Sequence, residues 1–116
     1  MRLRAHPFDL IASGKKTVEL RLFDEKRRAI RVGDTIAFTQ EGDASRRLLC
    51  RVIALHVFPT FRDLYRALPL CACGYTEEEA RTASHTDMAA YYSQEEQEKY
   101  SVVGIELRLL SEDTAE

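Results

Sequence analysis

The sequence is short of several residue types, and each shortage excludes a class of protein. It has no tryptophan. It also has no long apolar run, because the stretches near residues 52–58 and 102–110 are interrupted by polar side chains. About 20 apolar residues are needed to span a bilayer, so no membrane segment is expected. The N-terminus lacks the apolar segment and cleavage site of a secretory signal, which predicts a cytoplasmic protein. Three cysteines, an odd number, provide no disulfide framework, so we expect free thiols without a disulfide partner.

Glycine and proline are also scarce, with five and three residues among 116. No linker rich in these residues, no internal repeat and no low-complexity tract divides the chain. We therefore predict one compact domain over residues 1–110, the size expected for a single core. The last residues, 111–116, read SEDTAE and are predicted to form a polar tail.

Charge is divided unevenly along the chain. Residues 1–51 contain twelve Lys and Arg against seven Asp and Glu, a net charge of +5, whereas residues 52–116 contain five against twelve, a net charge of −7. The first half can therefore attract a partner that carries phosphate groups. The same distribution also fits two ordinary solvated surfaces, and charge alone does not decide between these readings.

Periodicity predicts a short helix and three strands in the first half. Residues 6–14 have the spacing of a helix that ends at Gly14, and residues 24–34 read as a charged loop. Strands are predicted over residues 35–40 and 46–58, the second long enough to curve or bulge. A further strand is predicted over residues 16–22, where Val18, Leu20 and Leu22 alternate with Thr17, Glu19 and Arg21.

The second half combines helix starts with a final strand. Thr60, Thr76 and Ser93 each precede a carboxylate by three residues, which is the spacing of a helix-capping box. Residues 101–110 alternate again, with the apolar positions 103, 105, 107 and 109 predicted to point inward. Strands on both sides of the helices, without a repeated strand–helix–strand unit, predict an α+β fold built as a small mixed barrel.

Several motifs resemble those of ASCH domains, the activating signal cointegrator homology family. The pattern Gly14-x-Lys16-x-x-Glu19-x-Arg21, followed by a Val-Gly-Asp turn at residues 32–34, resembles the family signature, and "AAYYSQEEQEKYSVVGIEL" resembles the C-terminal end of small stand-alone members. The resemblance implies a PUA-like mixed β-barrel with flanking short helices. It also implies a cleft that contains Lys16, Glu19 and Arg21, with Thr17 between them.

The residue types in this signature suit a binding site. Glu19 and Arg21 lie on one strand face, so Arg21 can hydrogen-bond Glu19 and still direct its guanidinium at a phosphate or a base. Lys16 breaks the alternation. Either it occupies the first strand position with its ammonium passing around the edge, or a bulge turns it toward Glu19. A plain ion-pair cluster on a strand surface is the alternative.

The first predicted function is binding of single-stranded RNA or a nucleotide-like small molecule in this cleft. Lys16, Thr17, Glu19, Arg21 and Tyr92 are the predicted ligand-binding residues, because aromatic rings can stack a base. Phosphate contacts are predicted for Arg4, Lys26, Arg27, Arg28 and Arg31. Phe23, Tyr75 and Tyr91 are further candidates for stacking.

The alternative function is that of a small hydrolase, acting on an acetylated nucleoside or as a ribonuclease. Family amidohydrolases use a threonine nucleophile three residues after the cleft lysine, where this chain has Glu19. Glu19 could instead act as a general base, with Lys16 polarising a carbonyl; Thr17 carries a hydroxyl but is displaced by two positions. No cofactor is expected. No metal site is expected either, because Cys71 and Cys73 lack a second closely spaced pair of ligands.

Overall fold

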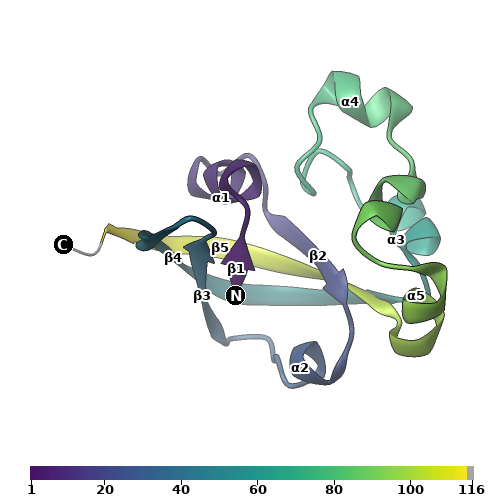
Figure 1. Cartoon of the computed structure of the whole chain (residues 1–116), viewed down its shortest axis with the longest axis horizontal. Coiled ribbons are helices and arrows are strands. Elements are labelled where there is room, and N and C mark those ends of the chain that lie inside the picture. Colours follow the sequence, from purple (N-terminus) through teal and green to yellow (C-terminus); the bar gives the residue numbers. More distant parts are fainter. Residues whose placement is uncertain (115–116) are drawn as a thin grey trace.

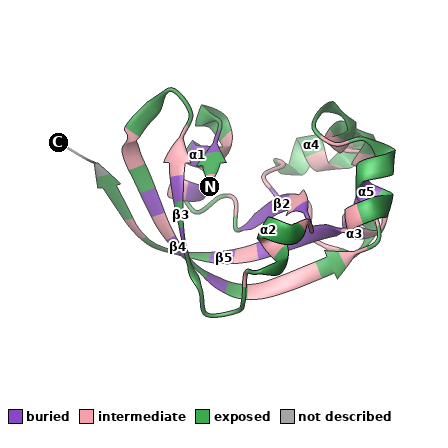
Figure 2. Ribbon diagram, turned by 60° about the horizontal axis from the view of Figure 1, so that its bottom comes forward, coloured by how far each residue is buried: buried purple, intermediate pink, exposed green. Residues whose placement is uncertain are grey.

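The computed structural model describes residues 1–114 as a five-stranded sheet curled into a half-barrel, with short helices around it (Figures 1 and 2). The strand order is β1-β3-β4-β5-β2, and only the β1–β3 pair is parallel. The strands are β1 (Arg2–Leu3), β2 (Val18–Leu22), β3 (Thr35–Gln40), β4 (Asp43–Phe58) and β5 (Val102–Thr114).

The predicted helix near the N-terminus and the three predicted in the second half are present, and α2 and η1 are two further helices. Helix α1 lies against the sheet near the N-terminus, and α3, α4 and α5 gather at the end of the sheet away from the C-terminus (Figure 1). Their bounds are α1 (Ala5–Ala12), α2 (Glu25–Arg28), α3 (Phe61–Ala67), α4 (Glu77–Thr82), the 3-10 helix η1 (His85–Ala90) and α5 (Gln94–Tyr100). No helix within residues 1–114 combines the length and apolar character that crossing a bilayer requires.

The predicted helix starts are confirmed. Thr60, Thr76 and Ser93 are the N-caps of α3, α4 and α5. The last two form complete capping boxes, in which each side chain accepts from a backbone N–H and a glutamate returns the contact. Thr60 instead donates its hydroxyl to Asp63 Oδ2 at 3.1 Å. Ser84 with Asp87 adds a capping box at the start of η1 that the sequence analysis missed.

Two hydrophobic clusters hold the domain together. The first joins α1 to the sheet and includes Phe8 and Phe38, both fully buried. The second packs β2 against α3 and includes Leu20 and Phe61. Each such side chain contributes about 1.5–3 kcal/mol when fully buried. The alternate residues Val18, Leu20 and Leu22 of β2 all belong to this second cluster, and every residue of the strand except Arg21 is buried.

Strand β4 bends as predicted. Its pairing with β5 shifts register between Leu49 and Cys50 and again between Val52 and Ala54. Because β4 pairs with both β3 and β5, these bulges curl the middle of the sheet. Leu109, predicted to point inward, is 37% exposed because it lies at the first shift.

Besides η1 and the two-residue strand β1, which were not predicted, two segments differ from the sequence prediction. Within the segment predicted as a charged loop, α2 forms because Asp24 caps it by accepting from the Arg27 backbone N–H at 3.1 Å. The predicted tail begins in a strand, because β5 continues to Thr114 and its last residues pair with residues 46–49 of β4. Alternating polarity is weak there, which hid the strand; residues 115–116 lie outside the described chain.

Candidate functional site

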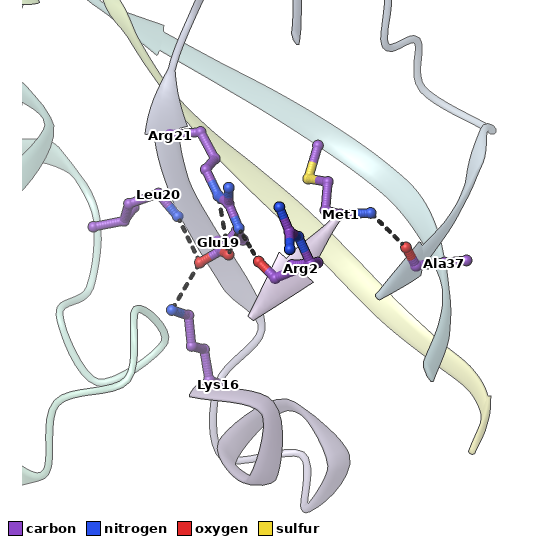
Figure 3. Close-up of polar contacts among 7 residues, drawn as sticks. All are labelled: Met1, Arg2, Lys16, Glu19, Leu20, Arg21 and Ala37. Carbon is purple, nitrogen blue, oxygen red and sulfur yellow. Dashed lines mark hydrogen bonds and ion pairs between the residues drawn. The ribbon is translucent and has the colours of Figure 1, made fainter. Parts of the chain in front are cut away.

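Glu19 is the centre of a buried charge cluster (Figure 3). It is only 4% exposed. Its Oε1 accepts from Lys16 Nζ at 2.9 Å and from the Leu20 backbone N–H at 3.2 Å. Its Oε2 accepts from Arg21 Nε at 3.2 Å and Nη2 at 3.0 Å. A carboxylate offers about four lone-pair sites, so these four donors occupy the whole accepting capacity of Glu19.

The cluster keeps Glu19 ionised. Burial alone would raise the pKa of this carboxyl, but the charges of Lys16 and Arg21 and their hydrogen bonds outweigh it and lower the pKa below its usual value. Glu19 therefore acts as a fixed negative charge that holds two cations in place. It is not an available proton acceptor.

Lys16 reaches Glu19 because it precedes the strand. Strand β2 begins at Val18, so the alternation of side chains between the two strand faces does not apply to Lys16. Its backbone N–H donates to Leu10 O at 3.0 Å, which folds the chain back over the end of α1. Its side-chain stem lies against Gly74, where an added Cβ would come within 3.2 Å of Lys16 Cδ.

Arg21 connects the two edge strands of the half-barrel. Besides its contacts to Glu19, its Nη2 donates to the backbone O of Arg2 at 3.0 Å. Arg2 lies in β1 and Arg21 in β2, the first and last strands in the sheet order. The two edge strands do not pair through their backbones, and the Arg21 side chain connects them instead.

This charge cluster forms one wall of a cleft of about 450 Å³. Lys16, Glu19 and Arg21, predicted from the signature, all line it, as do Tyr92 and Arg4. Aromatic and thioether side chains from residues 65–92 also line the cleft: Tyr65, Tyr75, Met88, Tyr91 and Tyr92. The cleft thus combines partly buried cationic groups with an aromatic wall.

A chain of hydroxyl groups fixes part of the aromatic wall. Tyr75 donates to Asp87 Oδ2 at 2.8 Å, and its oxygen lies 2.7 Å from the Tyr65 hydroxyl. Burial and these hydrogen bonds raise the pKa of Tyr75, and burial raises the pKa of Tyr65. Both phenols therefore stay protonated at neutral pH and serve as neutral hydrogen-bonding groups.

Thr17 lies apart from the cleft. Its side chain is exposed, whereas its backbone N–H donates to Ala72 O at 2.8 Å and its backbone O accepts from Leu107 N at 2.8 Å. Thr17 thus serves to join the start of β2 to the neighbouring segments. It is not among the residues that line the cleft, in contrast to the prediction.

The predicted phosphate contacts in and after α2 also lie outside the cleft lining. Arg27 pairs with Asp24 at 3.0 Å, and Arg28 sits 4.5 Å from the Phe23 ring centroid and donates to Tyr100 O. Lys26 and Arg31 are exposed. Of these cations, Arg27 lies close enough to Tyr92 for its charge to favour the ionised phenol, although burial raises the pKa of Tyr92 overall.

Other cleft residues had no signal in the sequence. His6 and Met88 line it, although neither belongs to the signature. Cys73 lines it too, and burial raises the pKa of its thiol to about 11. The three cysteines are free, and residues 1–114 contain no group of three or more His, Cys, Asp or Glu side chains suited to a metal ion.

A second concavity, of about 410 Å³, is lined by residues of α3, η1 and α5. Arg62, Arg66 and His85 line it together with neighbouring polar residues. None of the residues predicted for the site lies there.

Comparison with known proteins supports both the fold and the family. The profile described as "ASCH domain" matches residues 1–111. The crystal structure of hypothetical protein PH0355 is 31% identical, with a TM-score of 0.73 over 95% of this chain and 96% of that one. The solution NMR structure of protein PF0455 from Pyrococcus furiosus is 32% identical, with a TM-score of 0.64 over 96% and 99%. No curated protein matches the chain. The predicted α+β, PUA-like fold is confirmed.

Proposed function

Because this chain belongs to the ASCH domain family, we propose that its cleft binds single-stranded RNA or a nucleotide-like molecule. The main support for the proposal is that four hydrogen-bond donors already occupy the carboxylate of Glu19. With its accepting positions filled, the cluster presents donors: a lysine ammonium has three N–H groups and an arginine has five. Lys16 gives one contact to Glu19, and Arg21 uses Nε and Nη2. Their remaining donors can meet a ligand rich in acceptors, such as a base edge or a phosphate.

The aromatic wall supplies the second half of the recognition. Tyrosine rings can stack on the faces of a base, and single-stranded nucleic acids are bound through such stacking combined with cationic contacts. Arg2 and Arg4 lie at the same cleft and can contact phosphates. Lys26 and Arg31 are exposed and do not line the cleft, and they are proposed as outer phosphate contacts. Free thiols and this ligand class fit the cytoplasm as the compartment.

The hydrolase alternative receives less support from the same geometry. Glu19 cannot act as a general base while four donors occupy it, and Thr17 lies outside the cleft. The Cys73 thiol is protonated at neutral pH because its pKa is about 11. Glu79 lines the cleft, but its Oε1 accepts from the Thr76 backbone N–H at 2.9 Å as part of the α4 cap.

Proton NMR of the protein with acetylated cytidine tests both functions together. Saturation transfer from the protein to the nucleoside, without release of free acetate, is the expected result, and Lys16→Gln should remove the transfer. The matched control is Lys15→Gln, because Lys15 is exposed and does not line the cleft. Release of acetate that depends on Lys16 would replace the binding function with a nucleoside amidohydrolase. Absence of transfer with this nucleoside and with the four nucleoside monophosphates would overturn the proposal.

A further inference from the structure

Tyr91 is an exposed aromatic ring at the cleft. It is 55% exposed, although it lines the same cleft as the buried charge cluster. The guanidinium carbon of Arg4 lies 5.3 Å from the centroid of its ring. Arg4 precedes α1, whereas Tyr91 follows η1, so the two side chains meet from opposite ends of the domain's sequence.

Tyr92 has a different environment. Its ring stacks on Phe61 with a centroid distance of 5.8 Å and an interplanar angle of 21°, and it packs against the second core cluster. Burial raises the pKa of its phenol. Tyr91 lies beside Tyr92, with a centroid distance of 6.5 Å and an interplanar angle of 52°, and is not among the side chains of the second cluster. Tyr92 is therefore part of the fixed wall, and Tyr91 is the ring that an additional group can reach.

An exposed tyrosine beside an exposed arginine has the two functions that a nucleotide requires. The ring offers an apolar face on which any base can stack, and the guanidinium can hydrogen-bond a phosphate. Both groups line the same cleft as Lys16 and Arg21. A ligand held by the buried cations could thus extend to them through its backbone.

We infer that Tyr91 and Arg4 form a second nucleotide subsite, so that the cleft is built for at least two linked nucleotides. The base of the second nucleotide stacks on Tyr91, and Arg4 moves from the ring to the phosphate that joins the two nucleotides. This inference rests on the proposed function. It narrows the ligand class from single nucleotides to a single strand of at least two linked nucleotides.

Calorimetric titration with paired probes tests the subsite. The probes are the four nucleoside 5′-monophosphates and the four homodinucleotides with a 5′-phosphate. Wild-type protein should bind the preferred dinucleotide about tenfold or more tightly than its monophosphate, as expected for one stacked base. Tyr91→Leu should bring that ratio close to one, whereas Tyr91→Phe should preserve it because the ring face remains.

Val57→Ala is the matched control, since Val57 is exposed on β4 and does not line the cleft. It should leave the ratio unchanged. Monophosphate binding with no gain for the dinucleotide, or a gain that survives Tyr91→Leu, would overturn the second subsite and leave the proposed function standing. Failure of wild-type protein to bind any of the eight probes would overturn the proposed function itself, and the subsite with it.

Discussion

Arg21 donates from Nη2 to the backbone oxygen of Arg2 at 3.0 Å and, with the same guanidinium, to Glu19 Oε2. One side chain therefore connects the edges of the sheet and orders the charged wall of the cleft. The residue that shapes the half-barrel is thus also a proposed ligand contact. Its substitution should affect fold and binding together.

Replacing Arg21 by lysine tests this double role. A lysine keeps the charge but cannot contact Glu19 in two places and Arg2 at the same time. We expect faster amide hydrogen exchange in β1 and the facing part of β3, and a lower melting temperature. Arg51→Lys on the exposed side of β4 is the control and should change neither. Wild-type exchange rates in β1 of the Arg21 variant would contradict the link.

The free energy of unfolding should decrease as the pH is lowered, because Glu19 then becomes protonated. The pKa of this carboxyl lies below its usual value of 4.5 in the folded protein, so its contribution is fully present above about pH 4.5. It is lost as the pH falls through the lowered folded-state value, because the unfolded chain then takes up the proton first.

Glu19→Gln makes this contribution measurable. At pH 7 the variant should lose about 3–5 kcal/mol, the cost of removing one partner from a buried ion pair. Urea unfolding should show the difference from wild type shrinking at pH values below 4.5. Glu78→Gln, at an exposed position in α4, is the control and should follow the wild-type curve. A difference that stays constant with pH would show that Glu19 contributes through packing alone.

Gly74 should be required for the position of Lys16. Its φ of +108° disfavours any side chain, and a Cβ would meet Lys16 Cδ at 3.2 Å. Gly33 has a similar φ of +97° but no atom within 4 Å of an added Cβ. Alanine at either position should cost about 1–3 kcal/mol of stability through backbone strain. Only Gly74→Ala should also weaken nucleotide binding in calorimetry, and equal binding by the two variants would contradict this role.

The salt dependence of RNA affinity should distinguish the cations that line the cleft from those that lie outside it. Arg4→Ala should reduce the slope of log affinity against log salt for a short single-stranded RNA by about 0.7, the value of one phosphate contact. Arg28→Ala should have a smaller effect, because Arg28 is engaged with Phe23 and Tyr100. Arg108→Ala, exposed on β5, should have none. If Arg28→Ala reduced the slope as much as Arg4→Ala, the RNA phosphates would contact α2 as well as the cleft, which would contradict this prediction.

Local patterns predicted much of the fold. Alternation identified the buried positions 103, 105 and 107 of β5, and hydroxyl-to-carboxylate spacing identified three helix starts, because both depend on residues close together in sequence. Residues 111–114 were missed as part of β5, since their pairing with β4 depends on a distant partner strand. The helix α2 was missed because a single aspartate cap supports it.

The candidate site was predicted as a set of residues but not as an arrangement. The signature identified Lys16, Glu19 and Arg21, yet alternation placed Glu19 on a polar face. The cleft around Glu19 is also lined by Cys73 and Tyr92, which are distant in sequence, and no local pattern reports such packing. Contacts between distant residues, such as Arg21 to Arg2 and Arg4 to Tyr91, were out of reach for the same reason.

The most direct test of the central claim is a titration of isotope-labelled protein with a short single-stranded RNA, followed by amide NMR. We predict shifts concentrated at residues 16–21 and at Tyr91 and Tyr92, and their loss in Lys16→Gln while the rest of the spectrum stays that of a folded domain. Shifts confined to α2 or to the concavity around Arg62 and Arg66, or shifts that persist in Lys16→Gln, would contradict a nucleotide-binding cleft built on Glu19.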